Sequence, residues 1–381
     1  MKIMLSCGEA SGDLYAGALT AALRAREPGI EVFGFGGRRL AGAGGERIGD
    51  FEGLTVTGLI EVLRVLPRSL AMLKRLVAVA RERRPDVFVA IDFPDFNFRL
   101  MAEIHKLGIP VVYYVSPQLW AWRPKRMQTM KALVDKVLCI FPFESEIYER
   151  AGVPVEFVGH PLVDLAVATQ PRAAFLRARG LVPSAPTVAL LPGSRPNELH
   201  RIAPGMIAAL RGIRGQVKDV QFLVACAPTL PEAAFAPFIA GLPAPAPVLV
   251  HDRTDDVMAA SDVVITASGT ATVQAALHER PMVVVYKLSP LSYQLGKRFV
   301  QVDMYAMPNL VAGSRIVPEL IQDGFTPGRV VEETVSFLTD HDRHARTREA
   351  LRLVREQLGG PGASGRAADA ILQVARQRRS A

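Results

Sequence analysis

Short apolar runs recur along the chain, and segments with helical spacing of their apolar residues separate them. In the first half these runs are KIMLS, EVFGF, DVFVAI, VVYYV and KVLCI, and in the second half TVALLP, VQFLVA, PVLVH, DVVITA and PMVVVY. Continuous Val, Ile and Leu runs alternating with amphipathic helices are typical of parallel strands that are buried on both faces. The pattern predicts an α/β protein with doubly wound parallel sheets.

The connection LVDLAVATQPRAAFLRARGLVPSAP, polar and with prolines, separates the two series of runs. A chain of 381 residues is also too long for one compact core. We therefore predict two similar α/β domains, at 1–165 and 186–345. The C-terminal segment predicts a closing helix at 363–378 that completes the first domain, because its apolar residues share one helical face: Ala368, Ile371, Leu372 and Ala375.

The net charge of +8 favours an anionic partner, such as a phosphate, an acidic lipid surface or nucleic acid. The sign alone does not choose among them. The run GFGGRR lacks the third glycine of a dinucleotide fingerprint, and GxxxxGK[ST] does not occur. Both the dinucleotide oxidoreductases and the P-loop ATPases are therefore disfavoured.

The three cysteines, Cys7, Cys139 and Cys226, lie in apolar runs without a CxxC pair or a histidine cluster. This arrangement predicts buried thiols in a reducing compartment and no metal site. The start MKIMLS has no signal-peptide pattern, and the longest uncharged stretch, VVITASGTATVQAALH, is too polar to span a bilayer. We expect a cytoplasmic protein without a membrane span.

Doubly wound domains bind ligands beyond the carboxyl ends of their strands, so we expect the site residues in the loops that follow strands. In SCGEASGDLYAG, Gly8 and Gly12 permit a tight turn into a helix. Asp13 is explained as a first-turn carboxylate favoured by the helix dipole. Glu9 has no such simple explanation, and it is a candidate site residue.

The stretch VAIDFPDFNFRL places Asp92 and Asp95 in the loop between a buried strand and a helix that we expect to begin near Phe98. Helix capping accounts for one carboxylate but not easily for two. Neighbouring phenylalanines would partly desolvate a carboxylate here and make it a better base near neutral pH. We predict that Asp95 is a general base.

Two later turns combine small residues with helix starts. In LLPGSRPNELH, Gly193 and Ser194 offer backbone donors, and Arg195 adds a fork-shaped cation. In ITASGTATVQAAL, the turn 268–270 formed by Ser268, Gly269 and Thr270 repeats the arrangement. One such turn is usually only a turn, but two with an arginine in one domain favour a diphosphate site.

The motif series GEASGD, IDFPDFN, YYVSPQLWAWRPKR, VGHP, LLPGSR, ASGTAT and MPNLVAG resembles that of the bacterial lipid-A-disaccharide synthase family, in order from Cys7 to about Gly313. The resemblance implies the GT-B fold, in which two Rossmann-like domains face each other across a cleft. It also implies an inverting transfer from UDP-2,3-diacylglucosamine to 2,3-diacylglucosamine 1-phosphate. The products would be a β-1,6-linked disaccharide 1-phosphate and UDP, as a step of lipid A biosynthesis.

The same resemblance implies residue roles. Asp95 matches the family's proposed base, which takes the proton from the primary hydroxyl of the acceptor. Glu9, Asp86 and Asn309 match other functionally important positions, although Asp86 also reads as a plain strand-start residue after a proline. Arg195 and the turn 268–270 would hold the UDP diphosphate, with no metal and no cofactor.

One position departs from the pattern of related GT-B enzymes. Many of them have a glutamate after the second Gly-Thr turn, where it binds the ribose hydroxyls, whereas this chain has Gln274. An amide still accepts one hydrogen bond, so activity is expected with an altered affinity for the donor. On this basis Gln274→Glu should tighten UDP binding and Gln274→Ala should weaken it.

Both implied substrates carry acyl chains, which predicts visits to an anionic membrane surface. After Pro67, the segment up to Arg84 is expected to be an amphipathic helix on the sheet with a solvated basic face. Before Pro67, apolar residues surround most of the helix, which is typical of acyl binding or interfacial insertion. The candidates for lipid contact in and beside this stretch are Leu59, Leu63, Leu66, Arg64 and Arg68.

The cluster WAWRPKR contributes Trp120, Trp122 and Arg123 as an interfacial anchor, a sugar-stacking platform or a packed loop. A single cluster lacks the successive stacking platforms that bind single-stranded nucleic acid, so no nucleic-acid partner is expected. We expect peripheral association with the inner face of the inner membrane. The sequence does not distinguish a monomer from a homo-oligomer. Two alternatives remain: another UDP-sugar enzyme, such as an epimerase or a transferase with a different acceptor, or a non-catalytic binding protein for lipid or nucleotide sugar.

Overall fold

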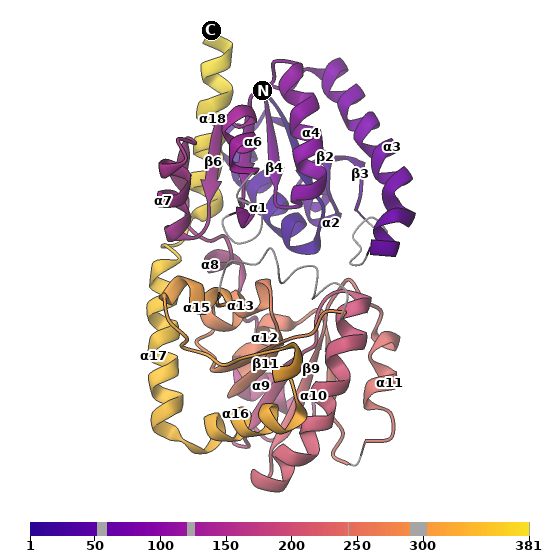
Figure 1. Ribbon diagram of the computed structural model, residues 1–381, viewed down its shortest axis with the longest axis vertical. Helices are drawn as coiled ribbons and strands as arrows, with labels where there is room; N and C mark the ends of the chain where they lie inside the picture. Colours follow the sequence, from indigo (N-terminus) through magenta and orange to yellow (C-terminus); the bar gives the residue numbers. More distant parts are fainter. Residues whose placement is uncertain (52–58, 120–125, 243, 290–302, 381) are drawn as a thin grey trace. The chain divides into compact units, whose positions relative to one another are not determined.

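The structure, a computed structural model, describes residues 1–51, 59–119, 126–242, 244–289 and 303–380. The described residues form two compact units, each built around its own parallel sheet (Figure 1). Of the described residues, one unit contains those within 1–161 and 358–380, and the other contains those within 162–289 and 303–357. Among the described residues, no helix is both long and apolar enough to cross a membrane.

The first unit contains a seven-stranded parallel sheet in the order β3-β2-β1-β4-β5-β6-β7. The central strands β1, β4 and β5 are almost wholly buried, as their apolar runs require. The strand order reverses direction between β1 and β4. The strands are β1 Lys2–Cys7, β2 Glu31–Phe35, β3 Glu46–Gly49, β4 Val87–Ile91, β5 Val111–Tyr114, β6 Lys136–Cys139 and β7 Val155–Phe157.

Helices cover this sheet, and the last helix of the chain returns to it. They are α1 Ala10–Arg26, α2 Arg38–Gly42, α3 Leu59–Arg83, α4 Pro94–Lys106, α6 Arg126–Leu133, α7 Pro142–Arg150 and α18 Ala363–Ser380. Helix α18 packs against α1 through buried Ala368, Ile371 and Ala375. Arg26 Nη2 of α1 donates to Asp369 Oδ2 of α18 at 2.9 Å. The C-terminal helix thus belongs to the core of the first unit.

The second unit contains a six-stranded parallel sheet in the order β10-β9-β8-β11-β12-β13, with its reversal between β8 and β11. Its strands are β8 Thr187–Leu191, β9 Gln221–Cys226, β10 Val248–His251, β11 Val263–Ala267, β12 Met282–Tyr286 and β13 Glu319–Ile321. Its helices are α8 Leu162–Leu165, α9 Arg172–Arg177, α10 Pro196–Gln216, α11 Ala236–Ile239, α12 Thr254–Ala260, α13 Thr270–Leu277, α15 Met307–Ala312, α16 Pro327–Thr339 and α17 His341–Gln357, with 3₁₀ turns at Glu232–Ala234 and Gln322–Gly324.

The connection between the two series of strands is anchored in the second unit. Thr169 N and Gln170 N donate to Asp256 Oδ1 at 2.7 and 3.0 Å, and Arg253 Nε donates to Asp256 Oδ2 at 2.6 Å. Burial alone would raise the pKa of Asp256, but these donors lower it overall. An ionised, buried carboxylate therefore holds the connection on α12.

The start of α4 corrects one expectation. The helix begins at Pro94 and not near Phe98, because Asp92 and Phe93 adopt left-handed conformations with φ of 46° and 49°. These two residues turn the chain at once, and the fixed φ of proline suits the first helical position. Asp95 therefore lies in the first helical turn rather than in a preceding loop.

Candidate functional site

The predicted site residues fall where each sheet reverses its strand order. Sheets of this topology bind ligands beyond the carboxyl ends of their strands, at that reversal. In the first unit, Glu9 follows β1 and Asp95 follows β4. In the second unit, Arg195 follows β8 and Thr270 follows β11. Each unit thus carries one cluster of candidate residues at its reversal point.

In the first unit, the loops after β1 and β4 touch each other. A Cβ atom added to Gly8 would lie 2.1 Å from the ring of Phe93, so a glycine is required for this close approach. Phe93 in turn packs with Phe96, with ring centroids 5.5 Å apart. Glu9 is the N-cap residue of α1, but its side chain does not cap the helix. The contact brings the Glu9 loop beside the start of α4.

Asn97, which sequence reasoning did not single out, joins the same two strand ends from a fully buried position. Its Oδ1 accepts from Ser6 Oγ at 2.6 Å, and its Nδ2 donates to the carbonyl oxygens of Asp92 at 2.7 Å and Ser6 at 3.2 Å. An asparagine in a first helical turn normally reads as a capping residue, so the pattern carries no signal for this role. Asn97 fixes the backbone from which Asp95 projects.

Asp95 is not desolvated by the phenylalanines, which corrects the predicted reason for its basicity. Phe96 and Phe98 turn into the core, whereas 72% of the Asp95 side chain is exposed. Its Oδ1 accepts from Arg126 Nη2 at 2.7 Å, and the Arg126 guanidinium lies 5.0 Å from the centroid of the Phe98 ring. The ion pair favours the ionised carboxylate, and the exposure leaves it within reach of a ligand.

Asp86 and Asp13 are not brought together with Glu9 and Asp95 as site carboxylates. Asp86 directly precedes β4, at the amino-terminal end of this strand, whereas Glu9 and Asp95 follow the carboxyl ends of β1 and β4. There its Oδ2 accepts from Lys2 N at 2.7 Å. This position fits the strand-start interpretation, and the functional role that the resemblance implies for Asp86 stays a prediction. Asp13 is buried and caps α2 rather than α1, since its carboxylate accepts from the backbone of Gly37 at 2.7 Å and Arg39 at 2.8 Å.

His160, Cys7 and Cys139 are unsuited to proton transfer near neutral pH. His160, from the VGHP motif, is buried between the rings of Tyr15 and Phe141, and burial lowers its pKa to about 3. Burial also raises the pKa of the Cys7 thiol well above its usual value and that of Cys139 to about 12. All three cysteines are buried, as expected, and no cluster of metal-binding side chains occurs in the described part of the chain.

In the second unit, the turn after β8 already holds a carboxylate. Glu198, in the first turn of α10, accepts from Ser194 N at 3.0 Å and from Arg195 Nη1 at 2.8 Å. Gly193 has a φ of 122°, and a Cβ there would lie 2.6 Å from the Cβ of Glu198. Sequence reasoning missed Glu198, although it shows that this turn holds an oxyanion with the two donors assigned to a diphosphate.

The turn after β11 is exposed at the start of α13. Gly269, the N-cap residue, has a φ of 144°, and no atom of the described residues lies within 4 Å of a Cβ built on it. Ser268 Oγ donates to the carbonyl oxygen of Tyr305 at 3.1 Å. The first N–H groups of a helix have no partner within the helix, so this turn offers donors to an anion.

Asn309 holds a structural position in the second unit, and its assignment to substrate binding stays a prediction. Its fully buried side chain accepts from Ile316 N at 2.9 Å and Val317 N at 3.0 Å. It donates to the Val317 carbonyl oxygen at 2.9 Å and to Glu319 Oε1 at 2.8 Å. These bonds occupy the full hydrogen-bonding capacity of the amide, so none is left for a ligand.

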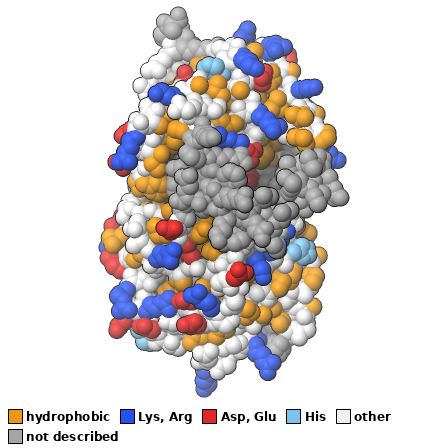
Figure 2. Space-filling model, in the orientation of Figure 1, with side chains coloured by type: hydrophobic (Ala, Val, Ile, Leu, Met, Phe, Trp, Pro, Cys, Tyr) orange, Lys and Arg blue, Asp and Glu red, His pale blue; other side chains and the backbone are white. Residues whose placement is uncertain are grey.

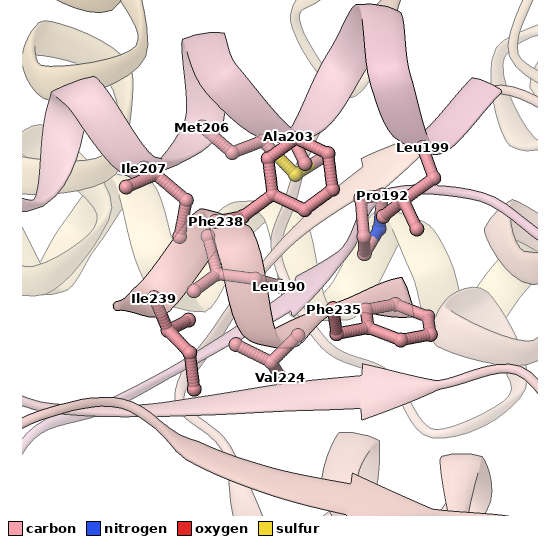
Figure 3. A pocket seen from close by; sticks show the side chains of 10 residues that line it. All are labelled: Leu190, Pro192, Leu199, Ala203, Met206, Ile207, Val224, Phe235, Phe238 and Ile239. Carbon is pink, nitrogen blue, oxygen red and sulfur yellow. The ribbon is translucent and has the colours of Figure 1, made fainter. Parts of the chain in front are cut away.

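A small apolar pocket lies beside the turn after β8, between α10, α11 and the strands β8 and β9 (Figure 3). Pro192, Leu199 and Phe235 line it at one end, and Ile207 and Ile239 line it at the other. It holds little more than one water-sized molecule, and its lining offers no polar side chain. Such a space behaves as a dry packing defect.

Helix α3 confirms the expected amphipathic segment after Pro67. Leu76 and Ala80 are buried against the sheet, while Arg68, Lys74 and Arg75 are exposed. Basic and apolar side chains are interspersed on the surface around α3 (Figure 2). The helix runs through Pro67 without a break, and Leu66 is half-buried. The candidates whose side chains lie outside the described residues are Leu59, Leu63, Arg64, Trp120, Trp122 and Arg123.

Proteins of a known family align with this chain over almost its whole length. The sequence matches the family described as Lipid-A-disaccharide synthetase over residues 3–374. Lipid-A-disaccharide synthases from Anaeromyxobacter sp. (strain K) and Myxococcus xanthus (strain DK1622) are 45% and 42% identical, and each alignment covers 98% of this chain. These alignments span 98% and 97%, respectively, of the relatives' own lengths.

Solved structures of low sequence identity share the fold. A UDP-GlcNAc 2-epimerase from Neisseria meningitidis, solved with UDP-GlcNAc, has a TM-score of 0.69 at 12% identity, covering 98% of this chain and all of that chain. The glycotransferase of kitacinnamycin has a TM-score of 0.65 at 18% identity, covering 98% of each chain. At such identities the likeness to an epimerase concerns the fold alone. By sequence and by fold, this chain belongs to the lipid-A-disaccharide synthase family of UDP-sugar-dependent GT-B glycosyltransferases.

Proposed function

We propose that this enzyme transfers 2,3-diacylglucosamine from its UDP derivative to the primary hydroxyl of 2,3-diacylglucosamine 1-phosphate, with inversion. Family membership supports a UDP-sugar donor and a sugar-phosphate acceptor. The observation that carries the proposal is the position of Asp95, an exposed and ion-paired carboxylate at the reversal point of the first sheet. A general base must be both ionised and accessible to the hydroxyl it deprotonates.

The residues of each unit then have separate tasks. Asp95 accepts the proton of the acceptor hydroxyl as its oxygen bonds to the anomeric carbon of the donor. The bond from that carbon to the diphosphate breaks, and negative charge develops on the leaving UDP. Arg195 and the N–H groups at the start of α13 stabilise this charge, as preorganised donors do in other transferases. Glu198 must release Arg195 and Ser194 when the diphosphate binds, because they are its present partners.

Release of UDP tests the proposal directly. We expect the protein to release UDP from UDP-2,3-diacylglucosamine only when 2,3-diacylglucosamine 1-phosphate is present, and to lose most of this rate with deacylated analogues. Donor turnover without an acceptor would indicate a hydrolase or an epimerase. Binding of UDP without any turnover would indicate a binding protein and would contradict the proposed reaction.

We also propose that the enzyme acts from the cytoplasm at the anionic inner face of the inner membrane. The acyl chains of both substrates, the net charge of +8 and the exposed basic residues of α3 support this location. Leu70 adds an apolar side chain that is 42% exposed on the same helix. A helix that offers apolar and basic side chains together suits the interface between headgroups and acyl chains.

Flotation with vesicles tests this location. Leu66→Ser combined with Leu70→Ser should lower binding to vesicles that contain anionic lipid, because it removes apolar area from the lipid-facing surface. Leu353→Ser is the matched control, since Leu353 is 46% exposed in the other unit. A double variant that binds vesicles like the wild type would contradict the proposal, and a marked fall in unfolding temperature would identify the two leucines as core residues.

A further inference from the structure

Gln274, the position that departs from the pattern of related GT-B enzymes, contacts a carboxylate of the neighbouring helix. Its Nε2 lies 3.2 and 3.3 Å from the two oxygens of Asp255, in the first turn of α12. His278, one turn further along α13, places its Nε2 3.0 Å from Asp255 Oδ1. The side chains of His278 and Asp255 are only 10% and 23% exposed. Asp255 thus lies between two side chains on the same face of α13.

This contact determines which way the Gln274 amide faces. An ionised carboxylate only accepts hydrogen bonds, so the NH₂ group of Gln274 points to Asp255 and the Nε2 of His278 carries a hydrogen. The carbonyl Oε1 of Gln274 is then turned away from Asp255. Helical side chains lean toward the N-terminus, and residue 274 lies about 6 Å along the axis from Thr270. Oε1 is therefore presented on the side of the turn 268–270.

We propose that Asp255, assisted by His278, is a positioning residue that orients the Gln274 amide so that its Oε1 accepts a hydrogen bond from a ribose hydroxyl of the UDP-sugar. The inference rests on the proposed function, because it needs the diphosphate at the turn 268–270. It also accounts for the amide at this position. A glutamate at 274 would face the Asp255 carboxylate at about the distance of a hydrogen bond, where like charges repel.

The inference reverses the expectation drawn from the sequence for Gln274→Glu. With Asp255 in place, this variant should bind UDP no more tightly than the wild type. Asp255→Asn alone should weaken UDP binding roughly fivefold. The asparagine has one acceptor oxygen for the two donors of Gln274 and His278, and its own NH₂ group can donate to Gln274 Oε1, so the Gln274 amide loses its fixed orientation. In the combined variant Asp255→Asn with Gln274→Glu, the new asparagine donates to the new glutamate, and this carboxylate accepts from the ribose hydroxyls. The combined variant should bind UDP at least as tightly as the wild type.

Calorimetric titration of the full chain with UDP, 2′-deoxy-UDP and 3′-deoxy-UDP measures these effects. Wild type should prefer UDP to at least one deoxy analogue, and Asp255→Asn should lose that preference while binding the analogue as before. Arg195→Ala is the control, because a lost diphosphate contact weakens all three nucleotides alike. Unfolding temperatures of each variant identify any loss that comes from folding.

Three results would overturn the inference. Asp255→Asn could lower the affinity for all three nucleotides equally, which would mark a structural role. Gln274→Glu could tighten UDP binding while Asp255 is present. The combined variant could bind no better than Asp255→Asn. A wild-type protein that binds no UDP would instead contradict the proposed function itself, so the two failures are distinguishable.

Discussion

Replacing Asp95 with asparagine should lower kcat by roughly 100-fold or more, because a positioned general base contributes on that order. The UDP affinity and the unfolding temperature should stay close to those of the wild type. Asp95 is exposed on the first turn of α4, so its carboxylate contributes little to packing. The asparagine Oδ1 still accepts from Arg126, which preserves the local geometry and removes only the basicity. Steady-state kinetics with both acylated substrates measure the change.

The same helix offers a matched control. Glu103 is a half-exposed carboxylate of α4 that pairs with Lys106 at 2.6 Å, so Glu103→Gln removes the same charge and a surface ion pair from the same helix. Surface ion pairs contribute little to stability, and we expect wild-type turnover from this variant. Turnover near the wild-type rate in Asp95→Asn would show that another group accepts the proton. An equal loss in both variants would point to the charge of α4 and not to Asp95.

The longer strands were predictable from the sequence, whereas three of the four edge strands were not. Each predicted run forms a strand, and most of these strands are buried on both faces, which demands an uninterrupted apolar sequence; the edge strand β10 was also predicted, from the run PVLVH. The prediction missed β3, β7 and β13, which lie at the sheet edges and have only four, three and three residues. In β3 and β7 no residue is fully buried. Such short segments carry neither an apolar run nor a clear alternation.

The places of the candidate residues were predictable, but their partners were not. Alternating strands and helices imply a doubly wound sheet, and this topology assigns ligands to the loops after strands. That rule selected Glu9, Asp95 and Arg195 as candidates, and the structure has all three in such loops or at the helix starts that follow them. The partners of a side chain come from elements that only the fold brings together. Arg126 lies 31 residues from Asp95, and Asp255 lies 19 residues from Gln274. No local pattern shows these pairs.

The largest loss of stability is expected from Asn309→Ala, in contrast to the catalytic change at Asp95. The substitution leaves the buried backbone N–H of Val317 without its acceptor and the Val317 carbonyl oxygen without the Asn309 donor, whereas Ile316 N keeps the Ser314 carbonyl oxygen at 3.0 Å. Each buried polar group that loses its partner costs about 1–3 kcal/mol, so the loss of both partners of Val317 predicts a total of about 3 kcal/mol. For a unit of this size, that corresponds to a fall of roughly 10 °C in unfolding temperature.

Thermal unfolding and UDP titration, done on the same samples, separate the two interpretations of Asn309. Gln216→Ala is the control, because Gln216 is an exposed amide at the end of α10 in the same unit, and its loss should change neither quantity. If Asn309 holds α15 to the start of β13, UDP affinity measured well below the unfolding temperature stays near that of the wild type. An Asn309→Ala protein that unfolds at the wild-type temperature but no longer binds UDP would return this residue to the substrate site. The four internal hydrogen bonds of its amide argue for the structural outcome, since a ligand could bind there only by breaking them.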